Sequence, residues 1–472
     1  MRNFVVGALL GVGLLLIAGC RGVPSAEERL SRQQVAAVAA RLEVPAHLPV
    51  LEPDAGLSNY LAFALLNAPA VRAAYFDWVA AVERVTVERS RPDPVLTFEA
   101  DIADVVMAVM PGLMQEFPGP GKLRAAAEVA TAESRAKYFA FETAVLQTAF
   151  DVKRAAYQLW SLDEQLRLQR ETLALLAELE AAARAQNAAG KVTLQDVYRA
   201  QIEQDRLASE IANLEDSRRP LLAQFKAALG LRAEQPDPPL PARLESTPLA
   251  LEADALLEAA FQRNPRLKAL EAELQMAEAA IALARKSAVP DFSLGAMTDV
   301  NASPVMVRPL AGMSLPIWRD KIAAQIARAT AGRDAAAARL SAEQLRLTVD
   351  FALKSFEYRA LTRTLALLEE KLVPKARQSF EIARAGYLAG QVDFFNLIEA
   401  ERTLLNFRLQ EVEAHTRRET VLAELSLLIA GLAPAGAPVL GPETEPPEPA
   451  TGLLQPATPV ALLRTFYAVS PL

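Results

Sequence analysis

The chain has 472 residues, more than one hydrophobic core usually organises, so we expect two structural units or an internal repeat. Hydrophobic residues make up 52% of the chain, and only 20 of its residues are glycine. This composition favours helix over sheet. The net charge of −7, without a basic block, argues against nucleic acid as a partner. Two histidines and one cysteine leave few groups for a metal site, a redox pair or a nucleophilic triad, so we expect no cofactor and no enzymatic activity.

Residues 1–19 have the features of a signal peptide, since a short positive start is followed by an uncharged apolar run from Phe4 to Leu16. Small residues then precede the single cysteine in Ile17-Ala18-Gly19-Cys20. This stretch resembles the lipobox of bacterial lipoproteins, which implies that Cys20 is lipidated, and Arg21 after it implies delivery to the outer membrane. The alternative is a plain secretory signal with an incidental cysteine. We therefore expect a lipidated N-terminal segment at residues 20–56.

Six features of the sequence recur at an offset that drifts only from 196 to 201 residues. They are Pro69 and Pro265, Pro94 and Pro290, Pro118 and Pro316, Lys122 and Lys321, Gly190 and Gly390, and Gly230 and Gly431. So regular an offset predicts two copies of one design, at residues 57–231 and 253–432. A proline-rich linker at residues 232–252 joins them, and a proline-rich tail at residues 433–472 is expected to lack a fold of its own.

Each copy contains a long stretch that is typical of a helical hairpin. In the first copy, residues 122–219 contain no proline and a single glycine, Gly190. This composition predicts helices at Leu123–Ala188 and Thr193–Leu229, which reverse at a tip formed by residues 189–193.

Leucines at alternating spacings of three and four residues indicate coiled-coil seams along these helices. In the first long helix they are Leu159, Leu162, Leu166, Leu173 and Leu176. A shorter opening helix is predicted near Val71–Arg89. The second copy has its tip at residues 389–393, and Pro374 is expected to bend or interrupt its long helix. Periodicity alone also leaves a soluble helical bundle open.

The segments at residues 94–118 and 290–316 differ from their surroundings, because apolar and polar residues alternate there as in strands with one apolar and one polar face. The apolar residues are Leu96, Phe98, Ala100 and Ile102 in the first segment, and Phe292, Leu294, Ala296, Ala311, Met313 and Leu315 in the second. Each segment is long enough for two membrane strands and a tight turn. A small soluble hairpin that caps a coiled coil is the alternative.

Four strands from one chain cannot close a barrel by themselves. An open sheet edge cannot be left in hydrocarbon, because each unsatisfied backbone group there costs several kcal/mol. A membrane-spanning version must therefore oligomerise, and three chains would supply twelve strands, enough to enclose a water-filled passage.

The order helix, β-hairpin and helical hairpin, repeated once, resembles the TolC family of outer-membrane efflux and secretion channels. The resemblance covers roughly residues 55–432, and its most specific pieces are Phe117-Pro118-Gly119-Pro120-Gly121-Lys122 and the stretch from Tyr387 to Leu405. It implies a mainly α fold with short β, in which a homotrimer forms a twelve-stranded β-barrel in the outer membrane of a Gram-negative bacterium. The barrel would continue as an α-helical tunnel into the periplasm.

The resemblance also implies partners. The tunnel would open when an inner-membrane pump and a periplasmic adaptor protein dock, and the lipidated start together with the Pro-Gly-Pro-Gly-Lys element points to the heavy-metal branch of resistance-nodulation-division (RND) pumps. The alternatives are the outer-membrane component of type I protein secretion, a periplasmic coiled-coil adaptor, and a structural lipoprotein. The sequence does not name the cargo.

The resemblance places a periplasmic gate just past the second tip. Asn396 and Glu399 match positions where family members carry acidic rings, and Asp393 lies one turn earlier. Threefold symmetry would turn Glu399 into three carboxylates around one axis, which favours cations over anions. Asn396 removes one of the two acidic rings, so weaker cation selectivity is expected. For Glu399 an ordinary solvated helix position is the alternative.

Tyr387 and Asp196 match family positions that hydrogen-bond between neighbouring hairpins and hold the tip closed, a strong pairing because the acceptor is charged. Val392 stands where the family has an arginine in a second latch. Gly190 and Gly390 are expected to adopt the left-handed backbone that a tight reversal needs.

The two β-hairpin segments also hold most of the methionines of the chain, namely Met107, Met110, Met114, Met297, Met306 and Met313. Thioethers suit soft metals. Methionine is also a common apolar filler, and the sequence gives these residues no fixed ligand geometry, so no metal site is predicted.

Overall fold

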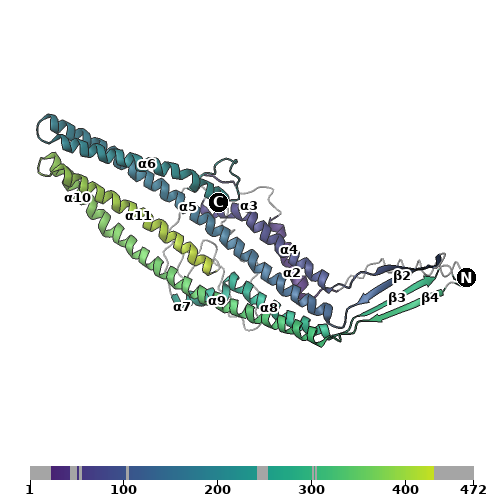
Figure 1. Ribbon diagram of the computed structural model, residues 1–472. Helices are drawn as coiled ribbons and strands as arrows, with labels where there is room; N and C mark the ends of the chain where they lie inside the picture. The colour runs from purple at the N-terminus through teal and green to yellow at the C-terminus, as the bar shows by residue number, and fades with distance from the viewer. Residues whose placement is uncertain are drawn as a thin grey trace. The chain divides into compact units, whose positions relative to one another are not determined.

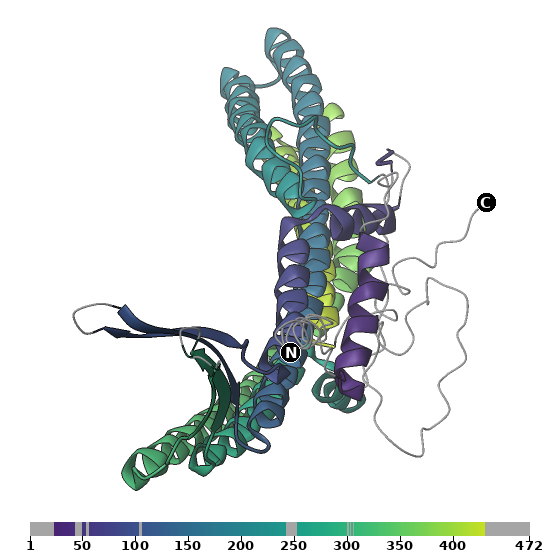
Figure 2. The same cartoon turned by 90° about the vertical axis from the view of Figure 1, so that its right-hand side faces the viewer.

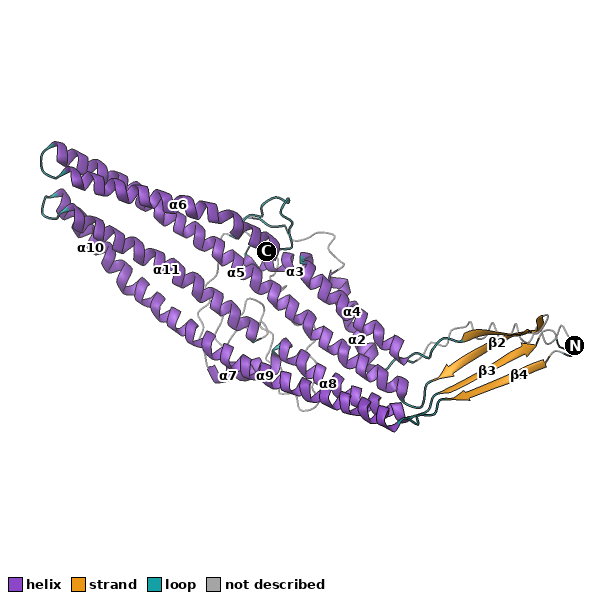
Figure 3. Cartoon of the chain, viewed as in Figure 1, coloured by secondary structure: helices purple, strands orange, loops and turns teal. Residues whose placement is uncertain are grey.

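The computed structural model describes residues 23–42, 50–52, 56–102, 106–241, 253–299, 302, 304 and 306–429. The predicted signal peptide, the lipidation site Cys20 and the C-terminal tail lie outside the described residues. The described part of the chain is mainly helical and contains one four-stranded sheet, as Figure 3 shows. The predicted combination of long helical hairpins with four short strands is confirmed.

The chain forms two compact units (Figure 1). Among the described residues, one unit contains Tyr75–Phe139 and Lys268–Ser341, together with residues 23–39. The other contains the described parts of Ala40–Ala74 and Ala140–Leu267, together with residues 342–429. Each unit draws on both copies of the repeat, so the copies are interleaved rather than folded as separate domains.

The sheet lies in the first unit and joins the two copies. Its strands are β1 Val95–Ile102, β2 Val106–Phe117, β3 Phe292–Asp299 and β4 Met306–Met313. They pair in the order β1-β2-β3-β4, every pair is antiparallel, and the β2–β3 pairing connects the hairpin of one copy to that of the other. Figure 2 shows the sheet as a curved surface.

One expected strand residue lies outside the sheet. The sequence placed Leu315 on the returning strand of the second hairpin, but β4 ends at Met313. Met313 pairs with Phe292, the first residue of β3, so Leu315 has no residue of β3 left to face.

The pairing register sorts the strand residues onto two faces with different chemistry. The face that we call the apolar face carries Leu96, Phe98, Ala100, Val109, Pro111, Leu113, Gln115, Phe117, Phe292, Leu294, Ala296, Thr298, Val307, Pro309, Ala311 and Met313. The opposite face, called the polar face, carries Val95, Thr97, Glu99, Met110, Gly112, Met114, Glu116, Ser293, Gly295, Met297, Asp299, Met306, Arg308, Leu310 and Gly312. Phe98 is 71% exposed and Leu294 is 55% exposed, so no described part of the chain covers these residues of the apolar face.

The first unit also includes an N-terminal helix that the sequence analysis missed, α2 Ala26–Leu42. Ser25 Oγ accepts a hydrogen bond from the Glu28 N–H (3.0 Å), as in a helix N-cap. The buried Glu28 carboxylate accepts from Arg89 Nε (2.7 Å) and Thr86 Oγ1 (2.7 Å) on α4 Pro69–Arg89. Burial alone would raise the pKa of Glu28, but these hydrogen bonds outweigh it and the pKa lies below its usual range.

The remaining helices follow the predicted order with one difference. They are α3 Leu57–Asn67, α5 Lys122–Ala188, α6 Leu194–Ala228, α7 Ala253–Arg263, α8 Pro265–Arg285 with the short η1 Lys286–Ala288, α9 Arg319–Leu367, η2 Leu368–Leu372, α10 Val373–Leu388 and α11 Phe394–Leu428. The difference is that in each copy a short helix precedes the opening helix, α3 before α4 and α7 before α8. The helix α4 begins at Pro69 because proline lacks an N–H and suits a first helical position. No helix among the described residues is both long and apolar enough to cross a membrane.

The second unit has its core along the predicted seams. Leu159, Leu162, Leu166 and Leu176 are all buried. Equivalent contacts recur in the two copies: Asn67 Nδ2 donates to Leu229 O (3.0 Å), and Asn264 Nδ2 donates to Leu428 O (3.0 Å). Each of these asparagines therefore ties the start of a copy to the end of its returning helix.

The predicted interruption at Pro374 takes the form of a π-helical turn. Between α9 and α10 the five residues of η2 are wound more widely than an α-helix, and Pro374 stands in the first turn of α10. Proline has no N–H to donate and its ring clashes with the carbonyl one turn earlier, so a wider turn relieves the conflict.

Candidate gate and hairpin junction

The two helical hairpins reverse at turns built in the same way. Gly190 has φ +70° and Gly390 has φ +73°, the left-handed backbone expected at both positions. Lys191 N donates to Gln186 O (2.9 Å) and Gln391 N donates to Gly386 O (2.8 Å), which closes each helix end in a Schellman pattern. A Cβ at either glycine would meet no atom within 4 Å, so the backbone conformation and not space selects glycine.

Just behind the turns the two hairpins share one hydrophobic cluster. It includes Val197, Ala200 and Leu207 of α6, Phe380, Ala383 and Tyr387 of α10, and Phe394, Leu397 and Ile398 of α11. The candidate gate residues lie on the helices that meet in this cluster, so a movement of one hairpin against the other would move them.

The three residues assigned to the gate differ in their surroundings. Asp393 is the N-cap of α11, and its carboxylate accepts the Asn396 N–H (Oδ1, 2.8 Å). Asn396 is exposed. Glu399 accepts from Arg402 Nη1 at 2.8 Å, one turn along the same helix. Asp393 therefore has a local structural role, whichever part it takes in a gate.

Arg402, which the sequence analysis did not single out, connects this region to the first hairpin. Besides Glu399 it pairs with Glu203 on α6, where its Nε lies 3.0 Å from Oε2. The contact between Arg402 and Glu399 was predictable from the sequence, because residues three apart lie on the same face of a helix. The second contact joins residues 199 positions apart, which no local pattern reveals. A charged partner weakens the field that Glu399 could present to a passing ion.

Glu401 is the most perturbed carboxyl group near the turns. It is 4% exposed, and its pKa is raised to about 7 by burial and then by the charge of Glu203. Arg402 and a hydrogen bond with Thr172 on α5 act in the opposite direction without cancelling the rise. Glu401 therefore links α11 to the first hairpin through Thr172, and the charge it places beside Glu203 depends on whether its carboxyl group is protonated.

Tyr387 and Asp196, the two residues predicted to form a latch, lie near each other without a hydrogen bond between them in the described part of the chain. Tyr387 is 1% exposed and packs edge-on against Phe394, with ring centroids 5.3 Å apart. Its hydroxyl is buried and has no hydrogen-bond partner among the described residues. Burial and then the nearby charge of Asp196 raise the pKa of Tyr387. The Asp196 carboxylate instead pairs with Arg199 at 3.6 Å, so the latch stays a prediction.

A second cluster, the hairpin junction, fixes the β-hairpins to each other at their base in the first unit. The Asp291 carboxylate accepts from Gly119 N (2.7 Å) and from Lys122 Nζ (2.7 and 2.8 Å). Asp291 N also donates to Ser314 Oγ at 2.8 Å. Burial alone would raise the pKa of Asp291, but the bonds from Lys122 and Gly119 outweigh it, and the pKa lies below its usual range.

Close packing of the two backbones explains why residue 119 at this junction is a glycine. A Cβ at Gly119 would come within 2.4 Å of Pro290 O, so no other residue fits there without movement of the second hairpin. Gly119 and Lys122 both belong to the Pro-Gly-Pro-Gly-Lys element that the sequence analysis singled out. The element serves to align the two hairpins in one sheet.

The described residues contain no group of three or more His, Cys, Asp or Glu side chains that could hold a metal ion. Near the turns, Glu399 and Glu203 pair with Arg402, Glu401 is buried, and Asp393 caps α11. This region can therefore bear charge and respond to protonation.

Comparison with known proteins agrees with this arrangement. The pattern that defines outer membrane efflux proteins matches residues 61–231 and 256–431, once in each copy. The chain is 27% identical over 253 residues to the cobalt-zinc-cadmium resistance protein CzcC of Cupriavidus metallidurans, which covers 52% of this chain and 59% of CzcC. The match therefore spans less than two thirds of that relative.

Solved structures show the same fold. The structure of CusC has a TM-score of 0.69 at 18% identity, over 82% of this chain and 94% of CusC. The open state of the MtrE outer membrane channel of Neisseria gonorrhoeae has a TM-score of 0.66 at 18% identity, over 82% of this chain and 93% of MtrE. Because the family pattern matches both copies and more than half of the chain, the protein belongs to the outer membrane efflux protein family.

Proposed function

We propose that the protein is the outer-membrane channel of a tripartite efflux system, in which three copies form one passage from the periplasm to the outside. The observation that carries the proposal is the sheet. It joins hairpins from both copies, has one apolar face, and leaves one side of β1 and one side of β4 without a described partner strand. Such a sheet is stable in a lipid bilayer only when its edges are closed by further copies.

An unpartnered stripe on α9 supports assembly from the helical side. Leu345, Val349, Leu353 and Phe356 are between 56% and 71% exposed and follow one helix face. The residues of α5 that match Leu345, Val349 and Phe356 at the offset of 199 are Leu146, Phe150 and Tyr157, and all three are buried. A large apolar stripe that is covered in one copy and bare in the other fits a contact with a neighbouring chain.

The proposal extends to location and partners. The chain would be lipid-anchored at Cys20 in the outer membrane of a Gram-negative bacterium, with its turns at Gly190 and Gly390 in the periplasm. A periplasmic adaptor and an inner-membrane pump of the RND type would engage those turns. The likeness to a protein named for cobalt, zinc and cadmium resistance favours metal cations as cargo. A ring of Glu399 side chains, each beside Arg402, would then act as a weak cation filter.

Assembly of a variant that cannot be lipidated tests the channel directly. A Cys20→Ala protein exported with an unrelated signal peptide should still form trimers in the outer membrane that dissociate only on heating in detergent. The purified trimers should conduct ions in planar lipid bilayers. Monomer recovered only from the periplasm would contradict the proposal and favour a structural coiled-coil lipoprotein.

A further inference from the structure

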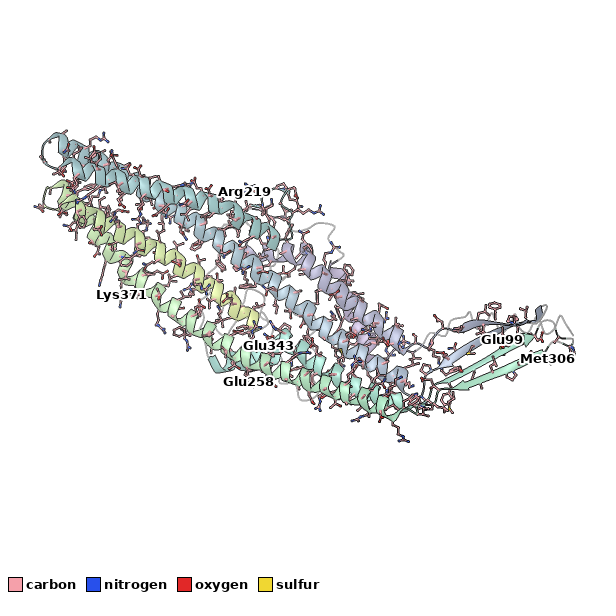
Figure 4. All side chains as sticks on the ribbon, in the orientation of Figure 1. Glu99, Arg219, Glu258, Met306, Glu343 and Lys371 are labelled. Carbon is pink, nitrogen blue, oxygen red and sulfur yellow. The ribbon has the colours of Figure 1, made fainter. Side chains whose placement is uncertain are left out.

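The segment that leaves the second hairpin displays large apolar side chains. This exit segment, residues 314–318, connects β4 to α9 at the base of the sheet, where the strands meet the helices. It lies at the opposite end of β4 from Met306, which Figure 4 labels. Leu315 and Ile317 are each 65% exposed, and Trp318 is 71% exposed. The described part of the chain therefore leaves most of each of these three side chains uncovered.

The backbone of the exit segment is fixed at both ends. Ser314 N donates to Asp291 O (2.9 Å), and Trp318 O accepts a hydrogen bond from Ile322 N (3.2 Å) in the first turn of α9. Between these bonds the ring of Pro316 sets one φ angle. The exposure of the apolar side chains therefore follows from a defined backbone.

The exit segment continues the apolar face of the sheet. At the base of the sheet Phe117 pairs with Phe292, and Phe292 pairs with Met313. Phe292 is 41% exposed and Met313 is 54% exposed. Leu315 follows Met313 by two residues, the repeat of an extended chain, and residues 313–318 include no charged residue. An exposed apolar surface therefore runs from the strands into the exit segment.

Charged residues begin directly after Trp318. The next three residues, Arg319–Lys321, are all charged and exposed. At the base of the first hairpin, the guanidinium of Arg91 lies 5.4 Å from the centre of the Phe117 ring. A change from apolar to charged residues at an exposed tryptophan is typical of a membrane–water interface, where an indole ring lies between acyl chains and water.

The first hairpin has no counterpart of this segment. At the offset of 198 residues, Trp318 corresponds to Pro120 and Ile317 corresponds to Gly119. A Cβ at Gly119 would come within 2.4 Å of Pro290 O, so a large side chain does not fit there. The apolar residues of the exit segment are therefore not a requirement of the hairpin design that both copies share. A trimer would carry three such segments, one from each chain.

We propose that Leu315, Ile317 and Trp318 anchor each chain in the periplasmic leaflet of the outer membrane, with the indole ring of Trp318 among the lipid headgroups. The inference rests on the proposed channel function, which places the apolar face in the bilayer. Lipid suits the segment better than a neighbouring copy does. In a protein contact the indole N–H and the charges that follow it would have to be buried, whereas at the headgroups they keep polar partners.

Quenching of tryptophan emission by brominated lipid tests the anchor. The purified full-length protein is reconstituted in phosphatidylcholine vesicles that contain brominated phosphatidylcholine. Because the chain has three tryptophans, quenching of Trp318 should remove roughly a third of the emission, more with bromines near the headgroup than near the chain end. Trp318→Phe should lose this quenching. Trp160→Phe is the matched control and should keep it, because Trp160 lies on α5 and packs against His415.

Iodide, which quenches from water, separates the other outcomes. Quenching of Trp318 by iodide but not by brominated lipid would place the indole in water, and quenching by neither would place it against another copy. Either result overturns the proposal. Conductance of the same preparations in planar bilayers tests the channel separately. Protein that conducts without lipid quenching of Trp318 contradicts only the anchor, whereas protein that shows this quenching without conducting contradicts only the channel.

Discussion

At the scale of single residues, Glu401 makes the helical contact sensitive to pH. Its folded pKa of about 7 exceeds its ordinary value of 4.5, so the folded protein holds the proton more tightly than the unfolded chain does. The stability that Glu401 contributes is therefore fully present below pH about 4.5, falls as the pH rises from about 4.5 to about 7, and is level above that range. By linkage the loss is about 3 kcal/mol. Deprotonation places a second carboxylate beside Glu203.

Replacing this carboxyl group should remove that pH dependence. Glu401→Gln is expected to melt at a higher temperature than the wild type above pH about 7 and to match it near pH about 4.5. Thermal unfolding followed by circular dichroism across this range measures the difference. Glu413→Gln, on the exposed side of the same helix, should leave the pH profile unchanged. A Glu401→Gln profile parallel to that of the wild type would rule out Glu401 as the source.

The buried hydroxyl of Tyr387 leads to a second prediction, which concerns the closed state of the channel. If it donates to a carboxylate of a neighbouring copy, Tyr387→Phe loses a charge-assisted bond of about 1.5–3 kcal/mol and the closed state weakens. The conductance of isolated trimers in planar bilayers should then rise roughly tenfold. Tyr198→Phe, an exposed tyrosine on α6, is the control and should conduct like the wild type. Unchanged conductance of Tyr387→Phe would remove Tyr387 from the latch.

At the scale of elements, Asp291 aligns two hairpins that are far apart in the sequence. Asp291→Asn removes the charge that holds Lys122 and weakens the bond to Gly119 N, so the two hairpins should separate more easily. The temperature at which trimers dissociate in detergent should fall by several degrees. Asp93→Asn is the matched control at the base of the first hairpin, where the described residues give Asp93 no ion pair. Equal dissociation temperatures for the two variants would show that the ion pair does not align the hairpins.

The sequence predicts elements well where one residue type controls the backbone. Proline and glycine positions located the strands, both helical turns and the interruption at Pro374. The helix α2 was missed although Ser25 and Glu28 have the spacing of a capping box. At the candidate gate, Gly190 and Gly390 were predictable from local chemistry. The contact of Arg402 with Glu203 and the burial of Glu401 were not, because both arise from packing between hairpins about two hundred residues apart.

At the scale of the whole molecule, the bare stripe on α9 should be covered by a neighbouring copy. Leu345→Gln/Leu353→Gln places two polar groups in that contact and is expected to weaken the trimer by several kcal/mol. Size-exclusion chromatography with light scattering should then detect monomer. Gln344→Ala/Thr348→Ala changes exposed residues on another side of the same helix and should stay trimeric. A trimer of unchanged stability in the first variant would place the subunit contact elsewhere.

The π turn at Leu368–Leu372 coincides with a difference in length between the two copies of the repeat. The offset between the copies is 199 at Lys122 and Lys321 but 200 at Gly190 and Gly390, so the second copy is one residue longer between these points. A π turn takes up one residue more than an α turn. From Leu365 to Tyr387 the buried residues follow one another in steps of three and four, except for one step of five from Leu368 to Val373. The additional residue of the second copy is thus accommodated within a continuous helix, and the buried seam continues on both sides of the π turn.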